Sequence, residues 1–76
     1  MQFDKELDAS GLACPLPIVK TKKAIAALAS GQVLKVTSTD SGSVADMPVF
    51  AEQGGHALLS SAEEPGGRFV FWLRKG

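Results

Sequence analysis

The sequence predicts an α/β (α+β) two-layer sandwich, in which a four-stranded mixed sheet carries two helices on one face. Three observations lead to this prediction. The alternation of a strand at residues 3–8 changes to the period of a helix at residues 15–29. Each expected helix is followed by glycine, and the last two apolar segments are separated only by a tight Pro-Gly-Gly turn. The expected order of elements is therefore β-α-β-α-β-β, in a single domain that spans residues 1–76.

The first strand is expected at residues 3–8 (FDKELD), where the character of the side chains alternates along the chain. Phe3, Lys5 and Leu7 are expected on one side of this strand, and the acidic residues that follow each of them on the other. Alternation with so few apolar residues indicates a short strand at the edge of a sheet.

The first helix is expected at residues 15–29, where the period becomes helical and alanine, a strong helix former, is frequent. Its apolar stripe is formed by Ile18, Thr21, Ile25 and Leu28. Pro15 and Pro17 lie in the first turn, where a missing N–H group removes no helical hydrogen bond. Gly31 can end the helix.

The second strand is expected at residues 33–39 (VLKVTST), which are rich in β-branched side chains. After an Asp-Ser-Gly turn, Ser43 is expected to cap a second helix that runs to Gln53. Pro48 lies inside this segment, and an interior proline costs about 3 kcal/mol unless the helix bends or starts late there. A glycine pair follows and should end the helix.

The third and fourth strands are expected at residues 56–63 and 68–74, joined by a hairpin turn at 65–67. The tight turn makes these two strands antiparallel, whereas the first crossover should be right-handed and should make the first two strands parallel. One face of the sheet would remain open, and the pattern does not decide on which face Trp72 lies.

The balance of charge excludes several classes of function. Lys and Arg number 8, as do Asp and Glu, so the formal net charge is zero. Broad electrostatic capture of nucleic acid or of a membrane surface needs an excess of positive charge, so neither partner is expected. The first ten residues hold no apolar run, and no segment approaches the length of a membrane span. We therefore expect a cytoplasmic protein, and a monomer.

One cysteine and one histidine limit the chemistry further. A single cysteine cannot form an internal disulfide, and one Cys with one His cannot supply the three or four ligands of a zinc site. Neither glycine pair has the Gly-rich, Lys-bearing pattern of a phosphate loop. We expect no cofactor and no metal, and we interpret His56 as a surface histidine.

Cys14 is the residue that we expect to carry chemistry, because it lies between the first strand and the first helix. There the free N–H groups and the positive end of the helix dipole favour an anion, so we predict a lowered thiol pKa. Gly11 permits the sharp bend, and Pro15 and Pro17 stiffen the turn so that the sulfur points outward. Lysines further along the helix (Lys20, Lys22 and Lys23) add positive potential. The alternative is a structural cysteine that is buried like a small apolar residue.

The motif GLxCPxP, followed by a helix that is first basic and then alanine-rich, resembles the TusA/SirA-like family of sulfur carrier proteins. The resemblance covers the whole chain. It includes Glu6-Leu7-Asp8 before the motif, Leu34-Lys35-Val36, the segment Asp46-Met47-Pro48-Val49-Phe50, and the closing Arg74-Lys75-Gly76. It implies the same two-layer sandwich.

The resemblance also implies that Cys14 accepts a sulfane sulfur as a persulfide and passes it to another protein. Gly11, Pro15 and Pro17 would support this residue as parts of the motif. The implied partners are donor and acceptor proteins of the rhodanese, cysteine desulfurase or DsrE type. Such a carrier is more a substrate of sulfurtransferases than an enzyme with its own turnover. A non-catalytic interaction module and a thiol redox protein are the alternatives, and the second would need an external resolving thiol.

Two further expectations concern the choice of partner. Members of the family that serve tRNA thiolation have an acidic residue between the two prolines, where this chain has Leu16. The resemblance therefore favours a sulfur-oxidation relay over tRNA thiolation. Lys20 and Lys23 flank the expected reactive sulfur and are candidates for docking an acidic partner.

Overall fold

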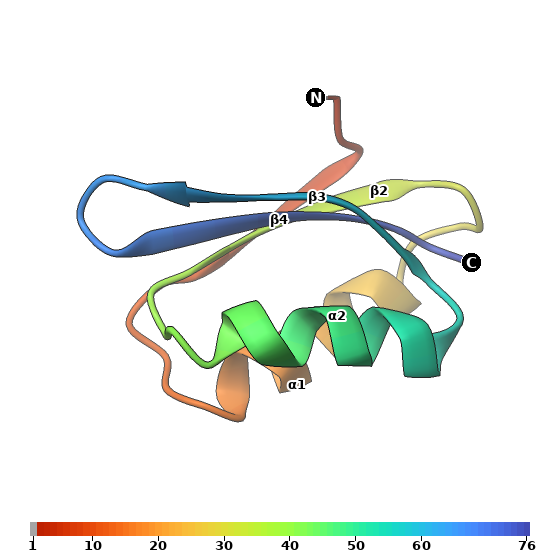
Figure 1. The fold of residues 1–76 in the computed structure, drawn as a ribbon. Helices are drawn as coiled ribbons and strands as arrows, with labels where there is room; N and C mark the ends of the chain where they lie inside the picture. The colour runs from red at the N-terminus through yellow and green to blue at the C-terminus, as the bar shows by residue number, and fades with distance from the viewer. Residues whose placement is uncertain (1) are drawn as a thin grey trace.

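The chain folds into two layers, a four-stranded sheet and a pair of helices that cover one of its faces (Figure 1). The computed structural model describes residues 2–76. In chain order the elements are β1 (Lys5–Ala9), α1 (Leu16–Ala26), β2 (Val33–Ser38), α2 (Ser43–Gly54), β3 (Ala57–Glu64) and β4 (Arg68–Arg74). The predicted β-α-β-α-β-β order and the two-layer sandwich are confirmed.

The strands lie in the order β1-β2-β4-β3. β1 pairs with β2 in parallel, and Ala9 at the end of β1 lies opposite Ser38 at the end of β2. β4 is antiparallel to both of its neighbours. The parallel pair and the antiparallel hairpin agree with the sequence prediction, and the parallel pair determines where the functional site lies.

The core lies between the sheet and the helices. Helix α1 contributes Ile25, and α2 contributes Met47 and Ala51. The sheet contributes two neighbouring pairs of buried side chains, Leu34 with Leu73 and Val36 with Phe71. On the expected stripe of α1, Thr21 is also fully buried, and its hydroxyl donates to the carbonyl oxygen of Pro17 at 2.7 Å. The stripe that was predicted from helical spacing therefore faces the sheet.

Two details at the helix ends differ from the prediction. Helix α1 ends at Ala26 instead of residue 29, because the next two N–H groups bond to carbonyls only three residues back and tighten the turn. Ser43 is not the N-cap of α2. Gly42 holds that position, and the Ser43 hydroxyl is buried and hydrogen bonded to Ser38 Oγ. Pro48 lies inside α2, so the helix does not begin there.

Trp72 lies on the sheet face that the helices leave open. It pairs across the strands with Lys35, whose ammonium lies 5.9 Å from the indole ring. The same ammonium is 5.3 Å from the ring centroid of Phe3 and 3.7 Å from a carboxylate oxygen of Glu6. The prediction that Phe3 shares the side of Leu7 is wrong, because the strand begins only at Lys5 and Phe3 lies beside Lys35.

Neither helix of the described part of the chain has the length and apolar character that crossing a membrane requires.

Candidate functional site

The site lies where two loops leave the same edge of the sheet. Because β1 and β2 are parallel, the loop after β1, which carries Cys14, and the loop after β2, which carries Asp40, begin side by side. The carboxyl ends of parallel strands are where ligands and reactive groups collect in sheets of this kind. The first turn of α2, with Asp46, follows directly. This topology brings together residues that are 32 positions apart in the sequence.

The loop that carries Cys14 is held by short hydrogen bonds. Gly11 has a φ of 80°, a conformation that glycine adopts without strain. Its N–H group donates to the Thr39 hydroxyl at 2.8 Å, which ties the two loops to each other. Ser10 N–H donates to Asp8 at 2.9 Å, and the Ser10 side chain together with this N–H holds the pKa of the Asp8 carboxyl below its usual value. Gly11 therefore has the bending role that the sequence predicted.

Cys14 is exposed, so the alternative of a cysteine buried in the core is wrong. Pro15 is the N-cap of α1, and Pro17 is buried in its first turn. The Cys14 thiol donates a hydrogen bond to Asp46 Oδ2 of the other helix, with a sulfur–oxygen distance of 3.4 Å.

The prediction of a lowered thiol pKa is wrong. The hydrogen bond to Asp46 raises the pKa of the Cys14 thiol above its ordinary value, with further contributions from desolvation and from the charges of Asp46 and Asp40. The helix does not compensate, because its first amides are already used. Leu16 N–H bonds to the Ala13 carbonyl at 2.9 Å, Pro17 has no N–H, and Ile18 N–H bonds to the Pro15 carbonyl at 3.1 Å.

A shallow pocket between the two helices adjoins the sulfur. It is lined mainly by apolar side chains, with Asp46 at one side and Gln53 further along α2: Pro15, Ile18, Asp46, Val49, Phe50 and Gln53. Val49, which lines this pocket, is 50% exposed, and the first turn of α1 carries two further exposed apolar side chains, Leu16 and Val19. A mainly apolar pocket beside an exposed thiol is typical of a place where another protein binds.

The other predicted residues lie at different places. Lys20 and Lys23 are exposed on α1, and neither is among the groups that act on the thiol pKa. His56 follows the C-terminal end of α2, whereas Asp46 and the sulfur lie at the opposite end of that helix. Its Nδ1 accepts a hydrogen bond from the Gly76 N–H at 3.1 Å, so it is a structural histidine of the surface.

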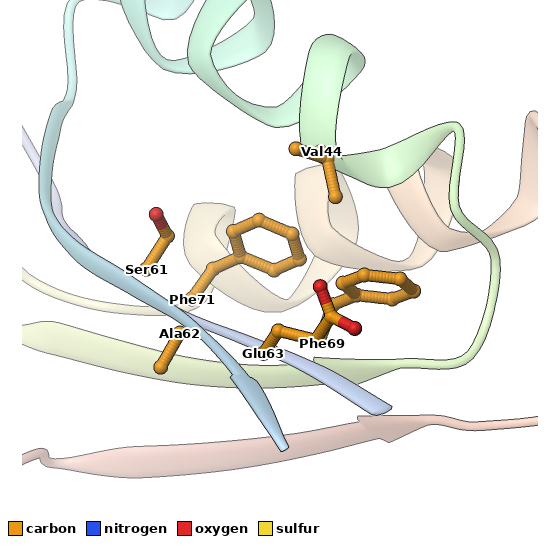
Figure 2. Close-up of a pocket in the computed structure, with 6 residues that line it drawn as sticks. All are labelled: Val44, Ser61, Ala62, Glu63, Phe69 and Phe71. Atoms are coloured by element: carbon orange, nitrogen blue, oxygen red, sulfur yellow. The ribbon is translucent and has the colours of Figure 1, made fainter. Parts of the chain in front are cut away.

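A second pocket lies away from the sulfur, between the start of α2 and the β3–β4 hairpin (Figure 2). Val44 of α2 faces the rings of Phe69 and Phe71 across it, and Ser61 and Glu63 of β3 form another wall. Cys14 is not among the residues that line it. Among residues 2–76, no group of three or more His, Cys, Asp or Glu side chains could hold a metal ion.

Asp46 is the residue of this site that sequence reasoning did not single out. In the sequence it is part of a segment that resembles the family, and its distance along the chain from Asp40 is not typical of paired carboxylates. The signal that could have found it is the predicted parallel pair, which places the start of the second helix next to the cysteine loop.

Comparisons with known proteins identify the class. The family model for sulfurtransferase TusA matches residues 5–75, nearly the whole chain. This chain belongs to the TusA family.

Individual relatives support the assignment. A sulfur carrier protein TusA from Allochromatium vinosum is 58% identical over 73 residues, which cover 96% of this chain and 95% of the relative. A putative sulfur carrier protein, YrkI, from Bacillus subtilis is 51% identical over 76 residues and covers all of both chains. The crystal structure of a SirA-like protein from Desulfitobacterium hafniense superposes with a TM-score of 0.85 at 28% identity and covers 96% of this chain and 99% of that one.

Proposed function

We propose that this protein is a sulfur carrier in which Cys14 accepts a sulfane sulfur as a persulfide and delivers it to an acceptor protein. The family and its named relatives support a carrier role. The observation that carries the proposal is the exposed thiol of the only cysteine, located in the CPxP loop beside a mainly apolar pocket.

The transfer needs only thiol and persulfide chemistry. The Cys14 thiolate attacks the outer sulfur of a donor persulfide, so a new S–S bond forms at Cys14 while the S–S bond of the donor breaks. The donor leaves as a thiolate and takes up a proton, which balances the proton that Cys14 loses. Cys14 is oxidised to the persulfide and the donor is reduced to its thiol. Delivery repeats the exchange with the acceptor thiolate as the attacking group.

The motif residues support this chemistry by position. Gly11 allows the bend that joins the loop to Thr39, and Pro15 and Pro17 begin α1 so that Cys14 precedes the helix in an exposed loop. Exposure favours the carrier over an interaction module with a structural cysteine. A redox protein is disfavoured because the chain has no second cysteine to resolve a mixed disulfide.

The partners are sulfur donors and acceptors, with rhodaneses, cysteine desulfurases and DsrE-type proteins as the candidate classes. Leu16 between the two prolines favours a sulfur-oxidation relay over tRNA thiolation. Lys20 and Lys23, both exposed on α1, are the docking candidates for acidic residues of a partner. We expect the carrier to act as a cytoplasmic monomer.

Loading by a persulfide donor tests the proposal. Incubation with a cysteine desulfurase and cysteine, or with a rhodanese and thiosulfate, should add one sulfur atom, about 32 Da, to the intact protein. Cys14→Ser should abolish the gain without altering the circular dichroism spectrum, because a hydroxyl is too weakly acidic to attack a sulfane sulfur. A mass gain that persists in Cys14→Ser, or no gain with either donor, would contradict the proposal.

A further inference from the structure

The hydrogen bond from Cys14 to Asp46 is not explained by the carrier role alone. Only a protonated sulfur can donate this bond, which joins the loop before α1 to the first turn of α2 with a sulfur–oxygen distance of 3.4 Å. A carboxylate at this position opposes ionisation of the sulfur, whereas the thiolate is the form that attacks a persulfide. The free protein therefore holds its nucleophile in the less reactive form.

We propose that Asp46 is a positioning residue that holds the Cys14 sulfur as a thiol in the free carrier, and that a sulfur donor activates this thiol by bringing a cationic side chain to Asp46. The inference rests on the proposed carrier function and names the regulation of that same site. Asp46 neither gains nor loses a proton in the transfer, since the proton that Cys14 loses is matched by the one that the donor thiolate gains.

The charges that face the sulfur come from two segments, and both are negative. Asp46 belongs to α2 and Asp40 to the loop after β2, and both oppose ionisation of the thiol. Helix α1 adds no charge near its start, because Leu16 to Val19 are uncharged and its first lysine is Lys20. The positive residues of the helix therefore do not offset the carboxylates.

Neither carboxylate is neutralised within the part of the chain that the structure describes. The one ion pair among residues 2–76 joins Lys35 to Glu6 on the open face of the sheet. The Oδ2 atom of Asp40 is buried and has no hydrogen-bond partner. Asp46, which is half-buried and lies next to the reactive sulfur, is therefore complementary to an arginine or lysine of a partner, since such side chains form strong charge-assisted hydrogen bonds with carboxylates.

This arrangement distinguishes a protein donor from small reactive molecules. A docked donor can place a cation against Asp46 and so remove both the hydrogen bond and the charge that stabilise the thiol. Neutral sulfane-sulfur compounds and neutral electrophiles bring no such cation, so they meet the sulfur in its protonated form. An exposed cysteine that carries sulfur is thereby less open to reaction with molecules other than its donors.

The first experiment measures the rate at which iodoacetamide, a small neutral reagent, alkylates Cys14 across a range of pH. Asp46→Asn should shift the midpoint of the rate profile to lower pH and raise the rate at neutral pH several-fold. Asp46→Ala should do the same, which shows that the effect comes from loss of the charge and not from a hydrogen bond donated by the asparagine amide. Asp46→Glu should give a profile close to the original. Glu52→Gln removes the same charge from an exposed position of the same helix and should change nothing. Profiles of Asp46→Asn and Asp46→Ala that superpose on the original would overturn the inference.

The second experiment tests the cationic partner. Loading by a cysteine desulfurase charged with cysteine should slow as salt is added, and the salt dependence should be smaller for Asp46→Asn because the attraction between the cation and Asp46 is lost. Equal salt dependence in both proteins would overturn the proposal that the donor brings a cation to Asp46.

The carrier function and the role of Asp46 can be contradicted separately. If the original protein never gains sulfur, the carrier function is wrong whatever the alkylation profiles show, and if it loads normally while the profiles superpose, only the role of Asp46 is wrong.

Discussion

The buried hydroxyls of Ser38 and Ser43 join the end of β2 to the start of α2, the helix that carries Asp46. Ser38 is 0% and Ser43 1% exposed, and their oxygens are 2.8 Å apart. Ser38 Oγ also accepts a hydrogen bond from the Asp40 N–H at 3.1 Å. We predict that replacing either serine by alanine destabilises the fold, and that the two losses are not additive.

The magnitudes follow from the bonds that each change removes. Ser43→Ala removes one buried hydrogen bond and leaves the Ser38 hydroxyl with its Asp40 contact, so the free energy of unfolding should fall by about 1–2 kcal/mol. Ser38→Ala removes two bonds and leaves both the Asp40 N–H and the Ser43 hydroxyl without that partner, which should cost about 2–4 kcal/mol. The double variant loses the shared bond only once, so it should be more stable than the sum predicts by about 1 kcal/mol.

Urea denaturation of the four proteins gives the three differences and their coupling, and thermal melts provide a check. In a domain of this size about 1 kcal/mol corresponds to a shift of roughly 4–8 °C in Tm. Ser41→Ala, at an exposed position of the same loop, is the control and should stay within about 0.5 kcal/mol of the original. Additive losses, or a cost for Ser38→Ala no larger than that of Ser41→Ala, would refute the reasoning.

Two further predictions concern docking and the end of α2. Replacing both Lys20 and Lys23 with Glu should slow loading by a protein donor, and more at low than at high salt, because salt screens charges over about 8–10 Å. Lys5→Glu, at the far end of β1, is the control. Equal slowing at all salt concentrations would argue against electrostatic steering by these lysines. Gly55→Ala should lower the free energy of unfolding by about 1–2 kcal/mol in urea titrations, because Gly55 ends α2 with a φ of 73°, which is unfavourable for alanine. The added methyl group meets no other atom, so the cost comes from the backbone conformation alone. An unchanged urea midpoint would contradict this.

Local pattern was sufficient to predict most of the fold. The helical stripe that contains Ile25 and the alternation along the strands depend on neighbouring residues, so they can be recognised without the tertiary structure. The exposed position of Cys14 was predicted for a similar reason, because Gly11 and two prolines define the loop locally.

The environment of the sulfur could not be predicted in the same way. The raised thiol pKa depends on Asp46, which reaches Cys14 only because β1 and β2 are parallel and α2 packs beside α1. The position before a helix predicted a lowered thiol pKa, which is the wrong direction, because the first amides of α1 donate to backbone carbonyls of the turn around Pro15. This is a detail of loop conformation. The role of Ser43 was mistaken because Ser38, its partner, lies on a different element.

The central claim is that Cys14 both receives sulfur and gives it up. The most direct measurement loads the protein from a charged cysteine desulfurase, removes the donor, and follows the intact mass after addition of an acceptor protein with a reactive thiol. If Cys14 is the carrier, the gain of about 32 Da lies on the peptide that contains Cys14 and then moves to the acceptor. A gain on any other residue, or a persulfide that remains on Cys14 with every competent acceptor, would contradict it.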